Sequence, residues 1–359
     1  MRPGPPASAA PAPAGITGVD AALAAFLAER RQELGAEAPE LLPLAEEVAA
    51  IVAAGGKRIR PAFLDWGYRA GGGAPDERTA RAGAALEMLH TFALIQDDLI
   101  DESAVRRGRP TAHVGLADLF EGEPAGRAAF GRAAALLASD LAFLWADDLL
   151  LGAGFDHDPL RAGYAVFTRM RREMTLGEFL DLAAASTEPV RAEEAALRAY
   201  RFKTAAYTVA RPIQLGIALA GGGADLQASV DAYALPAGVA FQLRDDLIGA
   251  FGDPVLTGKA SDDLSRGKPT WLLARALGRA GREGAAAILT TVAGGDASER
   301  GAERLREMVL ATGAPADAET LIEELAAEAL AGARRMPVSD ASLVGELVDL
   351  TERLVRRIA

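Results

Sequence analysis

Hydrophobic positions occur throughout the chain from about Val19 onward, embedded among Ala, Leu, Glu and Arg, which are strong helix formers. Alternating runs of β-branched and aromatic residues, which predict strands, are almost absent. The pattern therefore predicts an all-α protein. The expected helices cover residues 17–34, 42–53, 59–71, 76–101, 127–152, 158–184, 191–221, 225–251, 267–279, 281–292, 299–312, 316–334 and 339–358.

The breaks between these segments carry turn residues, such as Gly71-Gly72-Gly73 and Gly221-Gly222-Gly223. No repeat with a period of about 20–50 residues and no linker is evident, so we predict one large helical bundle over residues 17–359. The Pro- and Ala-rich residues 1–16 are predicted to form a disordered tail. Because they lack an apolar core segment, we expect neither a signal peptide nor a membrane anchor there.

Two predicted helical segments, residues 131–151 and 204–220, are apolar on more than one face. This pattern indicates either helices at the centre of a bundle or helices at a subunit interface. The sequence alone does not separate the two.

Composition and charge argue against several classes of function. The chain has 359 residues and a net charge of −12, which argues against a nucleic-acid partner. No uncharged apolar run reaches the roughly 18–20 residues of a membrane span, so no integral membrane segment is expected. The absence of cysteine excludes disulfides and thiolate metal sites and favours a cytoplasmic, reducing compartment. Of the 38 basic residues only four are lysines, at Lys57, Lys203, Lys259 and Lys268.

A first acidic motif ends the segment HTFALIQDDLID. Asp97 and Asp101 are four residues apart and therefore project from one helix face, with His90 two turns earlier. Carboxylates so close together repel unless a cation lies between them, and oxygen ligands without a neighbouring thiolate suit Mg²⁺. The alternative is a solvated acidic helix end.

A second acidic pair, Asp245 and Asp246, follows Gln242 in the apolar segment FQLRDDLIGAFGD. Two such pairs about 150 residues apart in one helical chain suggest a metal cluster shared between facing helices.

Basic clusters provide the complementary charge. The segment AGGKRIRP at residues 54–61 combines glycines, which allow close backbone approach to an anion, with three cations. It is not a Walker A loop, because Ile51 occupies the position of the first required glycine. Each cluster alone would suit a solvated surface, but together they match a site for two diphosphates and several Mg²⁺ ions. The other basic clusters are Arg106 and Arg107 in RRGRPTAH, Lys203 beside Thr204, and Lys259 and Lys268 around SDDLSRG.

These motifs, in this order, resemble the trans-type polyprenyl diphosphate synthases over roughly residues 50 to 275. The matching segments are GGKRIRP, HTFALIQDDLID, RRGRPTAH, GEFLDL, FKT, FQLRDDLIGAFGD and GKASDDLSRGKPT. The resemblance implies an isoprenoid synthase-like bundle of about a dozen helices around a central cavity, usually as a homodimer. It also implies a Mg²⁺-dependent, head-to-tail condensation of isopentenyl diphosphate with an allylic diphosphate, which releases pyrophosphate.

The resemblance further implies roles for individual residues. Isopentenyl diphosphate would be bound by Gly56, Lys57, Arg60, His90 and Arg107. About three Mg²⁺ ions would be bound directly by Asp97, Asp101 and Asp245, with Asp98 and Asp246 in support. The allylic diphosphate would be bound by Arg106, Lys203, Lys259 and Lys268, while Thr204 and Gln242 would stabilise the allylic cation.

Product length is expected to depend on Phe92 and Ala93. They precede Asp97 by five and four residues, about 6–7.5 Å along the helix axis. In the resembled family, a lone aromatic residue there, with no insertion in the acidic motif, is typical of C20 geranylgeranyl diphosphate synthases. Farnesyl or longer-chain synthesis is the alternative, and Phe92 as a simple core residue is the competing interpretation.

The chain departs from the family pattern at three positions: Gly249 replaces a third Asp of the second motif, Gln96 replaces His, and Glu178 replaces Gln. Gly249 raises the alternative of a non-catalytic synthase subunit, although such subunits usually lose the first acidic motif. A class I terpene cyclase is a further alternative, but it would not need the predicted isopentenyl diphosphate pocket.

Overall fold

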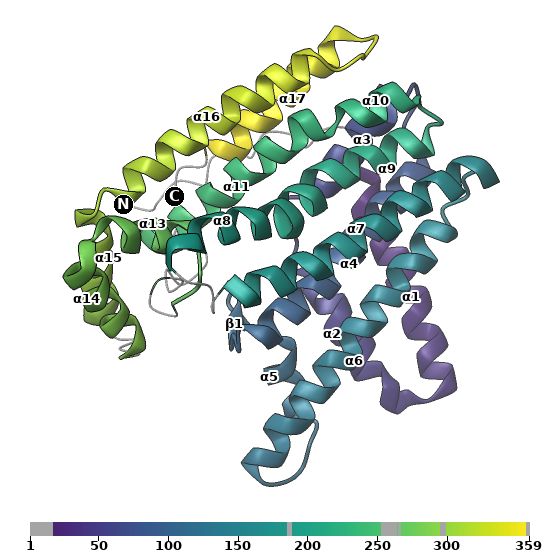
Figure 1. Ribbon diagram of the computed structural model, residues 1–359. Coiled ribbons are helices and arrows are strands. Elements are labelled where there is room, and N and C mark those ends of the chain that lie inside the picture. The colour runs from purple at the N-terminus through teal and green to yellow at the C-terminus, as the bar shows by residue number, and fades with distance from the viewer. Residues whose placement is uncertain (1–16, 185–188, 253–263, 265–266, 295–298, 357–359) are drawn as a thin grey trace, which may run out of the picture. The chain divides into compact units, whose positions relative to one another are not determined.

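The computed structural model describes residues 17–184, 189–252, 264, 267–294 and 299–356 (Figure 1). The predicted tail at residues 1–16 lies outside this range. The described elements are helical except for two short strands, and among them no helix is long and apolar enough to cross a lipid bilayer. The all-α prediction is confirmed. Contacts divide the chain into two compact units, the first drawn from Met1–Asp65, Ala74–Ala104 and Thr111–Phe155, and the second from Trp66–Gly73, Val105–Pro110 and Asp156–Ala359.

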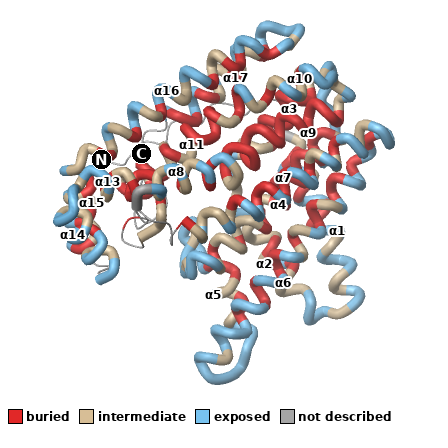
Figure 2. Tube along the Cα trace, viewed as in Figure 1, coloured by how far each residue is buried: buried red, intermediate tan, exposed pale blue. Residues whose placement is uncertain are grey.

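The first unit is built on two long helices, α4 (Glu77–Ile100) and α6 (Pro124–Leu151), which lie side by side. Helix α4 begins at a capping box: the Asp76 carboxylate accepts hydrogen bonds from backbone N–H groups, and the Thr79 hydroxyl lies 2.6 Å from the Asp76 nitrogen. Most α4 positions between Thr79 and Phe92 are buried (Figure 2). The remaining elements of this unit are α1 (Thr17–Glu37), η2 (Pro39–Leu41), α2 (Leu42–Ala53), α5 (Ala112–Ala117) and the first part of α3 (Ile59–Ala70).

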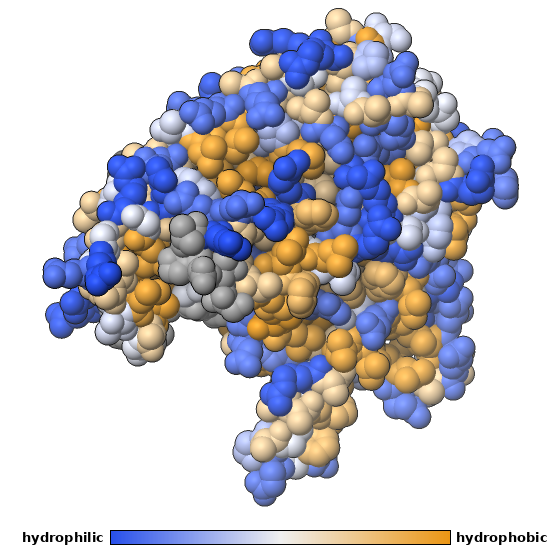
Figure 3. Space-filling model, in the orientation of Figure 1, coloured by the Kyte–Doolittle hydropathy of each residue, from blue (hydrophilic) through white to orange (hydrophobic). Residues whose placement is uncertain are grey.

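Helix α6 buries one face and exposes large apolar side chains on another. Leu137 and Leu144 are more than half exposed, and Phe130 and Leu151 extend the same seven-residue spacing. Apolar side chains accordingly gather over α6 in the space-filling view (Figure 3). The predicted apolar character of residues 131–151 on more than one face is therefore confirmed.

The second unit places α11 (Asp231–Phe251) beside α16 (Ala314–Arg334) and beside the π-helical segment η3 (Arg201–Ala210). Two glycines allow η3 to approach its neighbours closely. A Cβ atom at Gly177 would lie 2.4 Å from the Lys203 nitrogen, and one at Gly238 would lie 2.3 Å from the Ala205 Cα. Any side chain at either glycine would displace η3. The other elements of this unit are α7 (His157–Ala184), α8 (Pro189–Tyr200), α9 (Arg211–Leu219), α10 (Ala224–Ser229), α13 (Trp271–Arg279), α14 (Gly281–Ala293), α15 (Glu299–Ala311) and α17 (Ala341–Val355).

The structure differs from the expected elements in several places; for example, the segment 225–251 is divided into α10 and α11. Residues 105–110, which lie between two expected helices, form a hairpin of β1 (Val105–Arg106) and β2 (Arg109–Pro110), and the six-residue α5 follows it. The segment 191–221 contains a π-helix between two α-helices. The helix expected from residue 267 begins at Trp271, because the Thr270 hydroxyl caps it by accepting a hydrogen bond from the Leu273 N–H.

Candidate active site

The GGKRIRP segment connects α2 to α3, and one of its three cations is held by acidic side chains. Arg58 donates to the Glu87 carboxylate at 2.5 Å and to Asp20 at 2.9 Å. Burial would lower the pKa of Arg58, but Glu87 and Asp20 outweigh it and raise this pKa. Arg58 therefore anchors the loop, whereas Lys57 is exposed and Arg60 is half-buried at the start of α3.

The first acidic motif lies at the carboxyl end of α4. Asp98 is buried, Asp97 is half-buried, and Asp101 is the exposed C-cap residue whose N–H donates to the Asp97 carbonyl at 2.8 Å. The last turn of α4 contains no basic residue. Carboxylates at the negative end of a helix dipole are electrostatically unfavourable, so this end of α4 is suited to a bound cation.

The residues predicted to limit product length lie on the same helix. Phe92 is 8% exposed and contacts Phe143 of α6, with ring centroids 4.9 Å apart. Ala93 and His90 are half-buried. Sequence reasoning missed Phe143, since nothing local in the sequence indicates that it meets Phe92.

The two arginines that follow the first motif lie on the β1–β2 hairpin. Arg106 pairs with Arg109 across the strands, and the turn between them is formed by Arg107 and Gly108 with φ values of 51° and 74°. Consecutive left-handed residues are typical of a tight hairpin turn. The turn presents Arg107 as an exposed side chain.

In the second unit, Lys203 is bound by two carboxylates. Its Nζ atom lies 2.8 Å from Asp181 Oδ2 and 2.9 Å from Glu178 Oε2, all three side chains being less than one-quarter exposed. Glu178 is one of the three residues that depart from the family pattern, and the sequence analysis assigned no role to Asp181. In this structure Lys203 is already charge-compensated.

A chain of hydrogen bonds joins Thr204 to the second acidic pair. The Thr204 hydroxyl donates to Gln242 Oε1 at 2.6 Å, and Gln242 Nε2 donates to Asp246 Oδ1 at 2.9 Å. The buried Tyr200 hydroxyl donates to the other oxygen of Asp246 and accepts the Trp271 N–H at 2.8 Å. Burial and the Asp246 carboxylate raise the pKa of Tyr200 well above its ordinary value, which keeps its hydroxyl protonated.

The second acidic pair also lies near the carboxyl end of its helix. Asp245 is half-buried and Asp246 is buried, and the last turn of α11 contains no basic residue. These two carboxylates lie six and five residues before Phe251, outside the last turn, so the helix dipole acts on them less than on the first acidic motif. Within neither unit do three described carboxylate or imidazole groups come together as a complete metal-binding set.

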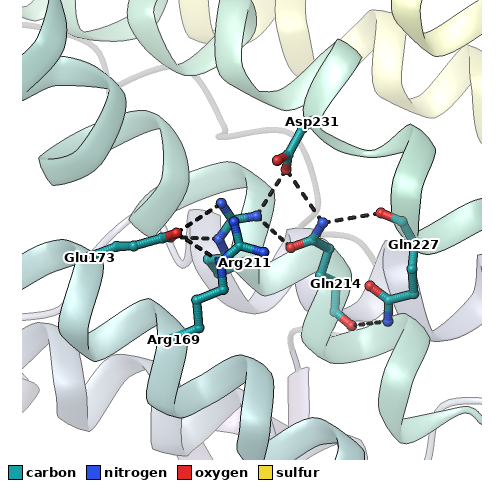
Figure 4. A network of polar contacts seen from close by, with 6 residues as sticks. All are labelled: Arg169, Glu173, Arg211, Gln214, Gln227 and Asp231. Atoms are coloured by element: carbon teal, nitrogen blue, oxygen red, sulfur yellow. Dashed lines mark hydrogen bonds and ion pairs between the residues drawn. The ribbon is translucent and has the colours of Figure 1, made fainter. Parts of the chain in front are cut away.

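A separate polar network connects α7, α9 and α11 in the interior of the second unit (Figure 4). The Arg211 guanidinium contacts Glu173 at 2.6 Å, Asp231 at 2.9 Å and Gln214 at 2.5 Å. Arg169 donates to Glu173 as well. This network contains none of the predicted site residues.

The two units thus divide the predicted site residues between them. The first unit contains Gly56, Lys57, Arg60, His90, Phe92, Ala93, Asp97, Asp98 and Asp101. The second contains Arg106, Arg107, Lys203, Thr204, Gln242, Asp245, Asp246 and Lys268. Lys259 lies outside the described residues.

Comparison with known proteins defines the family. A sequence model of the family "Polyprenyl synthetase" matches residues 43–309. The chain is 31% identical over 313 residues to the geranylfarnesyl diphosphate synthase of Aeropyrum pernix, covering 86% of this chain and 92% of that one. It is 32% identical over 310 residues to the (2E,6E)-farnesyl diphosphate synthase of Mycobacterium tuberculosis, covering 85% and 80%.

Solved structures agree. The crystal structure of geranylgeranyl pyrophosphate synthase from Corynebacterium glutamicum, complexed with isoprenyl diphosphate and magnesium, superposes with a TM-score of 0.89 at 36% identity. The match covers 96% of this chain and 99% of that one. The chain belongs to the polyprenyl synthetase family, and it is a prenyltransferase that elongates prenyl diphosphates. The all-α isoprenoid synthase fold implied by the sequence motifs is confirmed.

Proposed function

We propose that this prenyltransferase condenses isopentenyl diphosphate head-to-tail with an allylic diphosphate and makes C20 geranylgeranyl diphosphate. The observation that supports this chain length is the buried Phe92, which packs against Phe143 and lies five residues before an acidic motif without an insertion. An aromatic pair at that depth limits the space available to a growing chain on this side of α4. The 36% sequence identity to a geranylgeranyl pyrophosphate synthase supports the same length.

Mg²⁺ fits the acidic residues present. The first acidic pair lies in the last turn of α4, at the negative end of the helix dipole, and the second pair supplies two further carboxylates from α11. We assign Asp97, Asp101 and Asp245 as the direct ligands, with about three ions bound together with diphosphate and water oxygens. Bound Mg²⁺ would neutralise the charge that develops on the leaving diphosphate.

The basic residues divide between the two diphosphates. We assign Gly56, Lys57, Arg60, His90 and Arg107 to isopentenyl diphosphate, and Arg106, Lys203, Lys259 and Lys268 to the allylic diphosphate. Lys203 would exchange its contacts with Glu178 and Asp181 for the diphosphate, or be shared between them. Thr204 and Gln242 present hydroxyl and amide oxygens, the groups able to stabilise an allylic cation without reacting with it.

We further propose that the enzyme is a homodimer formed through α6. Phe130, Leu137, Leu144 and Leu151 form an exposed stripe with the spacing of a helix-packing seam. Such a stripe, which we call the α6 stripe, is more apolar than an ordinary solvated helix face and is suited to a second copy of itself.

The reaction is tested by incubating the protein with farnesyl diphosphate, labelled isopentenyl diphosphate and Mg²⁺. Label in a prenyl diphosphate supports elongation. Hydrocarbon formed without isopentenyl diphosphate would instead indicate a cyclase, and no turnover would indicate a non-catalytic subunit. Asp97→Ala is expected to reduce turnover by at least about 10³-fold, because a catalytic metal contributes several kcal/mol. Glu77→Ala, at the opposite end of α4, is the matched control and should stay active.

A further inference from the structure

Tyr200 lies where three elements of the second unit meet. It is the last residue of α8, directly precedes η3, and is 5% exposed. Its hydroxyl donates to Asp246 of α11 and accepts the first N–H of α13, from Trp271, at 2.8 Å. One oxygen atom therefore links the second acidic pair to the start of α13.

The other oxygen of the Asp246 carboxylate is also hydrogen-bonded. Asp246 Oδ1 accepts from Gln242 Nε2 at 2.9 Å, and Gln242 Oε1 accepts from Thr204 at 2.6 Å. The orientation of the Gln242 amide is therefore set by two groups, the Thr204 hydroxyl and the Asp246 carboxylate. Asp246 in turn depends on Tyr200.

The loop that precedes α13 shares this anchor. Lys268 lies three residues before Trp271, and its carbonyl accepts the Thr270 N–H at 2.7 Å. Because Thr270 caps α13 and Trp271 donates to Tyr200, the position of Lys268 is tied to the same hydroxyl.

We propose that Tyr200 is a positioning residue, whose hydroxyl holds Asp246, Gln242 and the Lys268 loop in the arrangement that binds Mg²⁺ and the allylic diphosphate. This inference rests on the proposed role of the second acidic pair. The function lies in the hydroxyl and not in the ring, since phenylalanine would fill the same volume but leave a buried Asp246 oxygen and the Trp271 N–H each without this partner.

The chain offers a matched control in Tyr233. It too is fully buried in the second unit, lies on α11, and places its hydroxyl 3.1 Å from the Thr351 hydroxyl. Tyr200→Phe and Tyr233→Phe each remove one buried hydroxyl. Both are expected to lower the melting temperature, but only Tyr200→Phe alters the acidic pair.

The first readout is kinetic. Tyr200→Phe is expected to raise both the KM for the allylic diphosphate and the Mg²⁺ concentration for half-maximal rate by about tenfold, the usual effect of losing a hydrogen bond to a charged group. The KM for isopentenyl diphosphate should change less than about twofold. Tyr233→Phe should leave all three values near those of the wild type.

The second readout needs no turnover. Mg²⁺ with inorganic pyrophosphate should raise the melting temperature of the wild type and of Tyr233→Phe, while Tyr200→Phe should lose most of this increase. If the two variants behave alike in both assays while the wild type binds and turns over, this inference is overturned alone. If the wild type shows neither binding nor turnover, the proposed function fails and this inference fails with it.

Asp246→Asn changes the acceptor of the hydrogen bond that Tyr200 donates. If Tyr200 acts through Asp246, the double variant should be no worse in Mg²⁺ dependence than Asp246→Asn alone. Losses that multiply across the two substitutions would show that Tyr200 acts elsewhere, and would contradict the proposal.

Discussion

Arg211 and Glu173 form a buried ion pair between α9 and α7, with Nε 2.6 Å from Oε2 and side-chain exposures of 4% and 10%. Removing the cation would leave a buried carboxylate without its main partner. Arg211→Leu is therefore expected to cost about 3–5 kcal/mol of unfolding free energy, measured by urea denaturation at pH 7.

The control is Arg198→Leu, which removes an exposed ion pair with Glu194 one turn along α8. That change should cost less than about 1 kcal/mol. Equal effects of the two substitutions would show that burial does not strengthen the Arg211 network.

The same ion pair predicts an acid-sensitive stability. Burial would raise the pKa of Glu173, but Arg211 and Arg169 outweigh it and hold this pKa below the ordinary value of 4.5. The carboxylate therefore contributes stability above pH 4.5, and this contribution is lost as the pH falls below that value. Glu173→Gln should be less stable than the wild type at pH 7 and should lose less stability between pH 5 and about pH 3. Parallel pH curves would contradict the assignment.

Product length should respond to Phe92. Phe92→Ala removes the ring that packs on Phe143 and is expected to shift products from C20 toward longer chains, seen by chromatography of the dephosphorylated alcohols. The matched control is Phe26→Ala, which removes a buried ring packed on Trp145, another α6 aromatic, with centroids 6.0 Å apart. It should cost stability without changing length. An unchanged product length in Phe92→Ala would show that Phe92 does not limit chain elongation.

The α6 stripe predicts the oligomeric state. Leu137→Glu combined with Leu144→Glu places two charges on it and should roughly halve the mass measured by light scattering. The control pair, Leu289→Glu and Leu310→Glu, changes leucines of similar exposure on α14 and α15. A wild type that is already monomeric, or a control pair that dissociates equally, would contradict a dimer through α6.

Most of the fold is predictable because helix formers and Gly-rich breaks are local signals. Helix α2 was predicted with its observed bounds, and α4 begins one residue later than expected because Asp76 is its cap. The β1–β2 hairpin was not predicted, because strands of two residues carry no alternating hydrophobic pattern. The π-helical geometry of η3 was not predicted, because hydrophobic periodicity does not distinguish it from an α-helix, and its close approach to Gly177 and Gly238 joins residues distant in sequence.

The candidate site was likewise predictable only where the signal is local in sequence. Ordered motifs identified the acidic pairs and basic clusters, because their spacing is local. Sequence alone did not indicate three contacts of the site. Arg58 forms an ion pair with Glu87, and the Tyr200 hydroxyl donates to Asp246. Lys203 is bound by Glu178 and Asp181. Each of these is a contact between residues at least 22 positions apart, set by helix packing.

The central claim is tested most directly by the mass spectrum of the prenyl alcohols released after incubation with farnesyl diphosphate, excess isopentenyl diphosphate and Mg²⁺. We predict geranylgeraniol, with C20, as the dominant alcohol. A dominant alcohol of C25 or longer, or recovery of farnesol alone, would contradict the proposal that Phe92 limits this enzyme to C20.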